Sequence, residues 1–254
     1  MSRLSNALKL VFLLFIAYLG SSGLIQKSNT AAYVQMFNGT IPTSVNLVIA
    51  HPDDEVMFFA PTLMQLDALL DSGVPVRVFS MTNGGADGLG GIRAHELQES
   101  IELLMRRKHP LVKVLDFADG MQEKWDLTAT ANSLKSLVTD TIPAFITFDD
   151  RGISNHVNHI SCYYTVKQLR GHYSKGLYFR LLSKQWFLQK YTAFVPALLY
   201  GHKSSQEIVF VSDFKTYLLS FATMLNAHVS QMVWFRYGWW MFSNYVYANE
   251  LQQF

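Results

Sequence analysis

Cysteine and net charge are both scarce in this sequence. Cys162 is the only cysteine among 254 residues, which excludes an intrachain disulfide and a cysteine-rich zinc cluster. This is typical of a domain in a reducing compartment. The formal net charge is only +2, from 21 Lys and Arg residues against 19 Asp and Glu residues. Such a balance lacks the positive field of most nucleic-acid-binding proteins, and the sequence has no nucleic-acid-binding motif, so we expect no nucleic acid partner.

Long apolar runs are also absent, with one exception near the N-terminus. Residues 10–19 are uninterruptedly apolar, with Arg3 and Lys9 before them and Lys27 after them. Residues 8–25 have the length of a minimal bilayer span, since a span needs about 17 to 25 residues. The alternative is a cleaved signal peptide, because small residues follow the apolar run. We favour one retained N-terminal transmembrane helix.

The rest of the chain alternates between strand-like and helix-like segments. We assign residues 1–26 to the anchor and residues 27–44 to a polar linker. Residues 45–254 are expected to form a single catalytic domain of the α/β class. The pattern predicts a mainly parallel sheet flanked by helices. Strands are predicted at 45–50, 76–81, 112–117 and 144–148, and helices at 61–70, 93–105, 127–138 and from about 156 onward.

Polar residues follow three of the predicted strands, at 51–55, 82–91 and 149–159. The carboxyl ends of parallel strands meet at one edge of a sheet, beside helix N-termini. Ligands of such sheets bind there. The sequence therefore predicts that these three polar segments converge on one site.

Imidazole and carboxylate groups gather at two of these strand ends. His51, Asp53 and Asp54 follow the first strand, whereas His156 and His159 follow the fourth and are spaced to share one helix face. Two histidines and one carboxylate, with a fourth position open to water, are usual ligands of a catalytic zinc ion. The alternative is that the carboxylates only cap the next helix. The second cluster at an equivalent strand end favours a metal site.

Two stretches carry a family resemblance. Residues 50–55 read Ala-His-Pro-Asp-Asp-Glu and residues 156–159 read His-Val-Asn-His. They resemble the metal motifs of the LmbE-like, or GlcNAc-phosphatidylinositol (GlcNAc-PI) de-N-acetylase, superfamily. The resemblance extends over residues 45–247, and the tail at 228–236 is similar to the eukaryotic membrane branch. Asn158 replaces an Asp that is usual in bacterial relatives, and Asn155 replaces a common Gly.

The resemblance implies a fold, a mechanism and a set of site residues. The fold is a single Rossmann-like (LmbE-like) domain, in which His51, Asp54 and His159 bind Zn²⁺ or another divalent cation. Asp53 is the expected general base, and a protonated His156 is expected to stabilise the oxyanion. The substrate-binding residues that the resemblance suggests are Arg93, Asn83, Asp87 and His228.

The implied reaction is hydrolysis of the N-acetyl group of GlcNAc-PI to GlcN-PI and acetate, the second step of GPI-anchor biosynthesis. The expected partners are this substrate and the lipid bilayer. One alternative is de-N-acetylation of another GlcNAc-containing conjugate. The other is an inactive membrane-bound binding protein, which is disfavoured because it would need neither the acidic cluster nor the paired histidines.

Three further patterns each allow two interpretations. The glycine-rich segment 84–91 either holds the substrate phosphodiester with its amides or is a mobile loop without anion contact. Arg93 either contacts substrate or pairs with Glu96 on the same helix. The eight aromatic residues within 234–247 either pack against the sheet or place a few outward-facing rings, such as Trp239 and Trp240, at the lipid headgroups.

Membrane orientation is the point on which two arguments conflict. The resemblance implies an endoplasmic reticulum membrane protein with its catalytic domain on the cytosolic face. The positive-inside rule favours the opposite, because Arg3 and Lys9 outnumber Lys27 as flanking charges. We expect the cytosolic orientation, since the difference is about one charge. The sequon at 38–40 can be glycosylated only in the lumen and therefore distinguishes the two.

Overall fold

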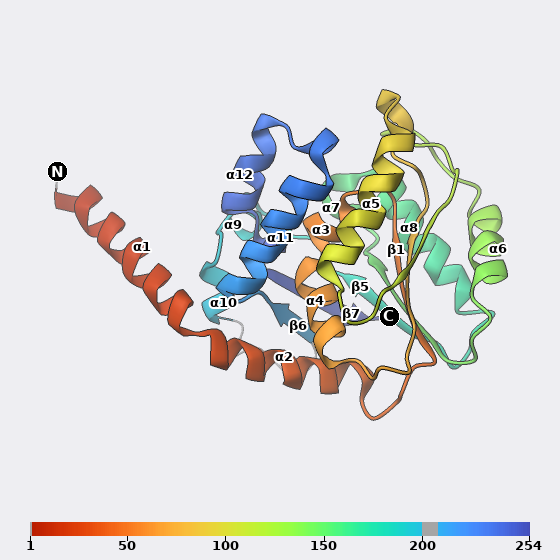
Figure 1. Cartoon of the computed structure of the whole chain (residues 1–254), viewed down its shortest axis with the longest axis horizontal. Helices are drawn as coiled ribbons and strands as arrows, with labels where there is room; N and C mark the ends of the chain where they lie inside the picture. The colour runs from red at the N-terminus through yellow and green to blue at the C-terminus, as the bar shows by residue number, and fades with distance from the viewer. Residues whose placement is uncertain (1, 200–207) are drawn as a thin grey trace.

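One α/β sheet forms the centre of the molecule (Figure 1). The structure is a computed structural model that describes residues 2–199 and 208–254. Within these residues the strand order is β3-β2-β1-β4-β5-β7-β6; neighbours from β3 to β5 are parallel, whereas β7 is antiparallel to β5 and to β6. The strands are β1 (Ser44–Ile49), β2 (Val76–Ser80), β3 (Leu111–Val114), β4 (Pro143–Phe148), β5 (Leu177–Leu181), β6 (Ile208–Val211) and β7 (Ala248–Gln253).

Helices cover both faces of the sheet. Helices α6 and α8 pack together on one face, and α8 contacts β1 and β4; helices α4, α5 and α11 pack together on the other. The helices are α1 (Ser2–Gly20), α2 (Ser22–Phe37), α3 (Asp54–Phe58), α4 (Ala60–Leu69), α5 (Gly90–Leu104), α6 (Leu127–Leu137), α7 (Gly152–Asn155), α8 (Val157–Leu169), α9 (Phe187–Lys190), α10 (Val195–Leu199), α11 (Phe214–Ala227) and α12 (Trp234–Phe242).

The predicted α/β class is confirmed, and its central strands show why the pattern is readable. Every residue of β1 and of β4 is buried, as inner strands of a parallel sheet must be when helices cover both faces. They therefore read as mainly apolar segments, in which Ser44, Asn46 and Thr147 are the polar residues. The antiparallel edge has no predicted counterpart: β7 has the polar sequence ANELQQ and becomes a strand because it pairs between β5 and β6.

Helix α2 occupies most of the segment 27–44 for which a polar linker is predicted, and that expectation is wrong for residues 27–37. Ile25, Met36 and Phe37 are buried on its inner side. Asn29 is the main polar contact: its side-chain amide donates to the carbonyl of Val211 and accepts from the amide of Val211, both at 2.8 Å. The side chain thus satisfies backbone groups of the edge strand β6. This segment belongs to the packed domain.

Helix α1 projects from the body of the molecule (Figure 1), and only its C-terminal part packs on the domain. There Tyr18 donates a hydrogen bond to the carbonyl of Ser212 at 2.8 Å. Toward the N-terminus, Leu8, Phe12 and Leu13 are exposed.

The predicted single span over residues 8–25 is interrupted. No single helix among the described residues has the length and apolar composition to cross a bilayer; the α1 and α2 segments have them together, across a bend of 63°. The bend falls at residues 20–23, Gly-Ser-Ser-Gly, where helix propensity is low.

Candidate metal centre and active site

The chain changes direction sharply between β1 and α3. Helix α3 begins at Asp54, and Asp53 just before it has a φ of 117°, which residues with a side chain rarely adopt. The amide of Asp53 donates to Glu55 Oε2 at 3.0 Å, which helps to hold this conformation. The two neighbouring carboxylates consequently have different partners.

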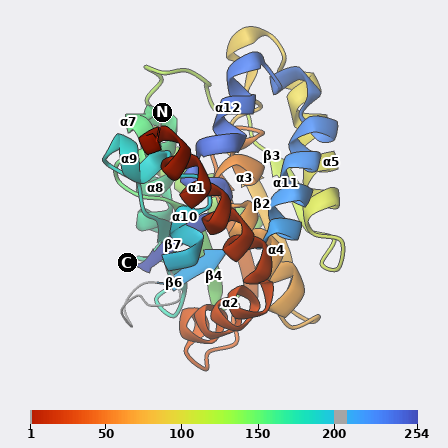
Figure 2. The ribbon, with the colours of Figure 1, turned by 90° about the vertical axis from the view of Figure 1, so that its left-hand side faces the viewer.

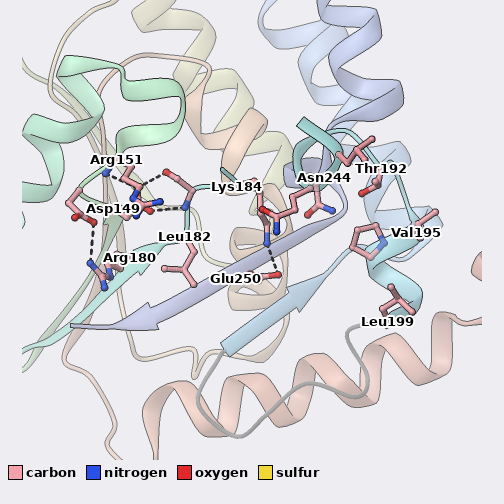
Figure 3. A pocket seen from close by; sticks show the side chains of 15 residues that line it. Asp149, Arg151, Arg180, Leu182, Lys184, Thr192, Val195, Leu199, Asn244 and Glu250 are labelled. Carbon is pink, nitrogen blue, oxygen red and sulfur yellow. Dashed lines mark hydrogen bonds and ion pairs between the residues drawn. The ribbon is translucent and has the colours of Figure 1, made fainter. Parts of the chain in front are cut away.

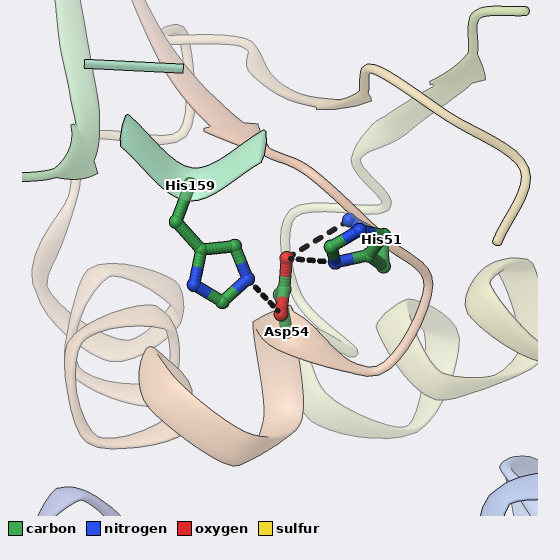
Figure 4. A group of neighbouring side chains, drawn as sticks. All are labelled: His51, Asp54 and His159. Carbon is green, nitrogen blue, oxygen red and sulfur yellow. Dashed lines mark hydrogen bonds and ion pairs between the residues drawn. The ribbon is translucent and has the colours of Figure 1, made fainter. Parts of the chain in front are cut away.

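The structure brings together His51, Asp54 and His159 (Figure 4). One ligand atom from each of the three lies within 4.8 Å of the others, and all three residues are buried. Asp54 Oδ1 lies 3.2 Å from His159 Nε2, and Asp54 Oδ2 lies 3.6 Å from His51 Nδ1. The clusters that follow the first and fourth strands therefore meet at one site, as their positions predict.

Surrounding groups orient these side chains as metal ligands require. Asp54 Oδ2 accepts the backbone amides of Ala50 and His51, at 3.0 and 2.9 Å. His159 Nδ1 lies 2.8 Å from the carbonyl of Gly152, to which it donates, so Nε2 is the ring nitrogen that faces Asp54 and is placed to contact a cation. That buried Nε2 has no hydrogen-bond partner among the described residues. Such outer contacts fix ligand tautomers in metal sites, and the group fits a divalent cation.

The pocket is electrostatically negative. Burial lowers the pKa of the His51 imidazole, but hydrogen bonds with Asp119 and Asp54 outweigh burial and raise the pKa to about 10. Burial likewise opposes ionisation of Asp54, yet His159 and His51 hold the pKa of this carboxyl well below its usual range. The raised pKa of His51 shows that the neighbouring carboxylates stabilise positive charge there, and the lowered pKa of Asp54 shows that its carboxylate stays ionised beside the two imidazoles. A bound divalent cation would take the place of the proton on His51.

Asp119 is a site residue that the sequence patterns did not single out. Its Oδ1 lies 3.0 Å from His51 Nε2. It follows β3, so the signal that could have found it is the one used for the other strands: a carboxylate just beyond the carboxyl end of a predicted strand.

Asn158 contacts the same imidazole nitrogen of His51 as Asp119 does. Its Oδ1 lies 3.3 Å from His51 Nε2 and accepts the amide of Gly120 at 3.1 Å, while its Nδ2 donates to the carbonyl of Glu123 at 2.9 Å. An Asp here would lose that donor, which explains how Asn serves at this position. Asn155 has a φ of 59°, and Asn tolerates this region better than most residues that carry a side chain. The change from Gly therefore keeps the loop conformation possible.

Asp53 faces two guanidinium groups. Its Oδ2 lies 2.8 Å from Arg236 Nη2 and 3.5 Å from Arg93 Nη2, and it is 4% exposed. Arg236 comes from α12, 183 positions along the chain. It is the second site residue without a sequence-based assignment of its own, although it belongs to the family-like tail.

His156 lies beside the three clustered residues and caps α8. Its ring centroid is 4.8 Å from that of His51 and 4.6 Å from that of His159. Burial and the charges of those two imidazoles lower its pKa to about 4. His156 Nδ1 accepts the amide of Asn158 at 3.3 Å, so the neutral ring carries its proton on Nε2. The structure thus favours a neutral hydrogen-bond donor where a protonated imidazole was expected.

His228 does not face the open side of the site, contrary to the expectation of substrate contact. It is fully buried, and its Nε2 lies 2.6 Å from Glu55 Oε1, which also accepts Ser100 Oγ at 2.5 Å. Burial lowers the pKa of His228, but Glu55 outweighs burial and raises it. Because Glu55 also holds the amide of Asp53, His228 supports the turn from beneath.

Arg93 joins two loops of the site. Its Nη1 donates to the carbonyl of Gly84 at 2.9 Å and its Nη2 to the carbonyl of Pro52 at 2.7 Å. A Cβ at Gly84 would lie 2.5 Å from Arg93 Cζ, and φ there is 69°, so only glycine allows this approach. Glu96 binds the amide and hydroxyl of Ser230 instead, so the alternative Arg93–Glu96 pair is not the one formed.

Asn83 directly precedes the glycine-rich segment 84–91 and is partly buried, whereas Asp87 lies within the segment and is exposed. The amide of Ala86 in this segment donates to Asp119 Oδ2 at 3.1 Å. This amide already donates its hydrogen bond to a carboxylate, which disfavours phosphodiester binding at this point of the loop.

Comparisons with known proteins identify the family of the chain. Residues 46–169 match the family model described as GlcNAc-PI de-N-acetylase. The chain is 37% identical to N-acetylglucosaminyl-phosphatidylinositol de-N-acetylase of Saccharomyces cerevisiae, over 95% of this chain and 92% of that protein. It is 36% identical to a probable enzyme of the same name from Schizosaccharomyces pombe, over 83% and 86%. The fold is similar to N,N'-diacetylchitobiose deacetylase from Pyrococcus horikoshii, with a TM-score of 0.58 and 15% identity over 87% and 86% of the two chains.

The family model and the yeast relative define a hydrolytic deacetylase, and the fold is that of the LmbE-like α/β class, in which the buried His-Asp-His group lies at the carboxyl edge of the sheet. Within this class the chain belongs to the GlcNAc-PI de-N-acetylase family, because the similarity to the yeast protein extends over nearly the whole length of both chains. The resemblance found in the sequence motifs is confirmed.

Proposed function

We propose that this chain hydrolyses the N-acetyl group of GlcNAc-PI with the help of a zinc ion held by His51, Asp54 and His159. The products are GlcN-PI and acetate, as in the second step of GPI-anchor biosynthesis. The observation that carries the proposal is the buried group of three ligand side chains beside Asp53. The substrate is inferred from the family to which the chain belongs and from the name of the yeast relative.

The donor set supports zinc over harder cations. Two imidazoles and one carboxylate suit Zn²⁺, whereas Mg²⁺ and Ca²⁺ prefer oxygen ligands alone. When bound, a zinc ion supplies Lewis-acid activation of water and of the amide carbonyl near neutral pH.

Asp53 is the proposed general base. Its carboxylate accepts a proton from the attacking water and passes it to the amine nitrogen as the C–N bond breaks. Arg236 and Arg93 hold this carboxylate in place. Water thus adds its oxygen to the acetyl carbon; one of its protons passes through Asp53 to the amine nitrogen, and the other leaves when the acetic acid product ionises to acetate.

His156 is the proposed oxyanion donor. As the amide carbonyl becomes tetrahedral, its oxygen gains negative charge, and a neutral His156 can donate its Nε2 proton to that oxygen as a hydrogen bond. Arg93, Asn83 and Asp87 remain proposed substrate contacts. Arg93 has the best support among these three, because its guanidinium lies 3.5 Å from Asp53.

We also propose that the enzyme is held at the endoplasmic reticulum membrane by its N-terminal segment, with the catalytic domain on the cytosolic face. The exposed apolar side chains of α1 support the membrane association. The test is Asn38, which is exposed at the end of α2. A glycosidase-sensitive mass shift of the protein expressed in cells, lost in Asn38→Gln, would place the domain in the lumen and contradict the cytosolic orientation.

One experiment tests the enzymatic proposal directly. The purified full chain is analysed for metal content, and acetate release is measured from synthetic GlcNAc-PI. We expect about one zinc per chain, loss of acetate release after chelation, and recovery when zinc is added back. Acetate release that survives complete removal of metal would contradict the proposal.

A further inference from the structure

An apolar groove of about 470 Å³ lies between α9 and α12. Arg236 is the only charged residue of its wall, and six of the other residues are large and apolar or aromatic. The groove is lined by Met57, Phe187, Tyr191, Phe235, Arg236, Gly238, Trp239 and Phe242.

The groove lies next to the proposed catalytic residue Asp53. Arg236 contributes to its wall and binds Asp53 Oδ2 at 2.8 Å. Trp239 contributes another part of the wall, and its ring centroid is 5.4 Å from that of Phe58, which is 5.7 Å from that of the metal-ligand candidate His159. A molecule whose acetamide lies at the metal centre therefore has this groove beside it.

The elements around the groove expose large apolar side chains to solvent. Phe187 is 73% exposed on α9 and Trp234 is 84% exposed on α12, next to Phe235 and Phe242. Trp240, by contrast, is fully buried against Phe221, so it cannot reach lipid headgroups as suggested by the sequence. A contiguous exposed apolar surface of this kind marks an interaction site.

The same side of the molecule carries α1. Figure 1 shows α1 leaving the body on the side of α9, α10 and α12, and Figure 2, turned to face that side, shows α1 crossing in front of α10. The exposed apolar side chains of α1 include Leu8, Phe12 and Leu13. A bilayer that receives α1 therefore lies on the side to which α9 and α12 are exposed.

A second cavity, of about 730 Å³, is more polar and less suited to an acyl chain (Figure 3). It lies beside β5 and β7, and two of its cations, Arg180 and Lys184, already have acidic partners. Arg180 lies 3.3 Å from Asp150, and Lys184 lies 2.5 Å from Glu250.

We propose that the groove between α9 and α12 holds an acyl chain of the lipid-linked substrate, so that these two helices rest on the membrane surface while the sugar reaches Asp53. The inference rests on the proposed function, because it takes the substrate to be a diacyl lipid. The groove then recognises the hydrocarbon part, and the metal centre acts on the acetamide.

Gly238 provides a way to fill the groove without disturbing the fold. It lines the groove in α12, and a Cβ added there meets no atom within 4 Å. The matched control is Gly171, exposed beyond the end of α8 at the opposite end of the sheet, where an added Cβ has one ordinary contact, at 3.6 Å. Full-length Gly238→Leu and Gly171→Leu thus introduce the same side chain inside and outside the groove.

Each protein is assayed with GlcNAc-PI in phosphatidylcholine vesicles and with water-soluble GlcNAc-inositol phosphate, which lacks acyl chains. We expect the ratio of kcat/KM for the lipid to kcat/KM for the soluble substrate to fall about tenfold in Gly238→Leu, the effect of displacing about two methylene groups. The ratio should not change in Gly171→Leu. Phe187→Ser, which removes an exposed wall residue, should also lower it, even if Gly238→Leu folds poorly.

The possible failures are distinguishable. A ratio that stays constant in both groove variants, or a groove that binds a protein segment with no effect on lipid turnover, would overturn the acyl-chain inference. An equal loss with both substrates would also overturn it, because the effect would then lie at the metal centre. If the unmodified chain releases acetate from neither substrate, the proposed function itself fails.

Discussion

Residues 44–169 and residues 177–254 contribute to the active site in different ways. The first segment contains β1 to β4 and supplies the three metal-ligand candidates together with Asp53 and His156. The second segment forms the antiparallel edge of the sheet and supplies Arg236, His228 and most of the apolar groove. The family model matches only residues 46–169. The comparison indicates that the metal-ligand candidates lie in the parallel half, while the C-terminal segment supplies the arginine that binds Asp53 and most of the groove proposed to hold the lipid.

The largest effect is expected for loss of a ligand in the parallel half. His159→Ala should lose the metal and reduce acetate release to background, a greater loss of metal affinity than the 10- to 100-fold typical of outer-sphere changes. Metal analysis and acetate assays measure this. His172→Ala, at an exposed position, is the control and should retain both. Stoichiometric metal in purified His159→Ala would contradict the assignment of His159 as a metal ligand.

Asp53→Asn should separate chemistry from metal binding within the same half. The amide cannot accept a proton from water, so kcat should fall by about 10²- to 10⁴-fold, while metal content stays unchanged. Asp71→Asn, an exposed carboxylate elsewhere, should have full activity. Loss of metal in Asp53→Asn would instead mean that this carboxylate is a ligand.

His228→Ala tests the support that the C-terminal segment provides. It leaves Glu55 buried without the imidazole that pairs with it, so the free energy of unfolding should fall by about 3 kcal/mol or more, as for other broken buried ion pairs. Urea denaturation measures this, and His228→Gln, which can still donate a hydrogen bond, should lose less. A change below about 1 kcal/mol, typical of exposed pairs, would show that the Glu55–His228 contact contributes little.

Arg236→Lys should have the smallest effect. Lysine keeps the positive charge but lacks the planar guanidinium that reaches Asp53, so kcat should fall by about tenfold, or roughly 1.4 kcal/mol of transition-state stabilisation. Metal content and stability should not change. Steady-state kinetics on the soluble substrate measures this effect separately from lipid binding. An unchanged kcat would show that Arg236 does not position Asp53.

The parallel half could be predicted from sequence because its signals are local. The apolar runs of β1 and β4 reflect burial on both faces, and His51 and Asp54 lie three residues apart in one loop. The rest depends on contacts between distant residues. Arg236 reaches Asp53 across 183 positions, and β7 has a polar sequence that reads as a strand only once its neighbours are in place.

The α/β class and the family could be predicted from the sequence alone, and the family resemblance then singled out the three metal-ligand candidates. Spacing along a strand and its following loop indicated only that the two clusters share one edge of the sheet. Three features were visible only in the tertiary structure. His228 pairs with the buried Glu55 and does not line the site, and Asp119 and Arg236 contact His51 and Asp53. Residues 22–37 form a helix that packs on the domain. Burial and pairing of polar groups depend on what packs around them, and no local pattern contains that information.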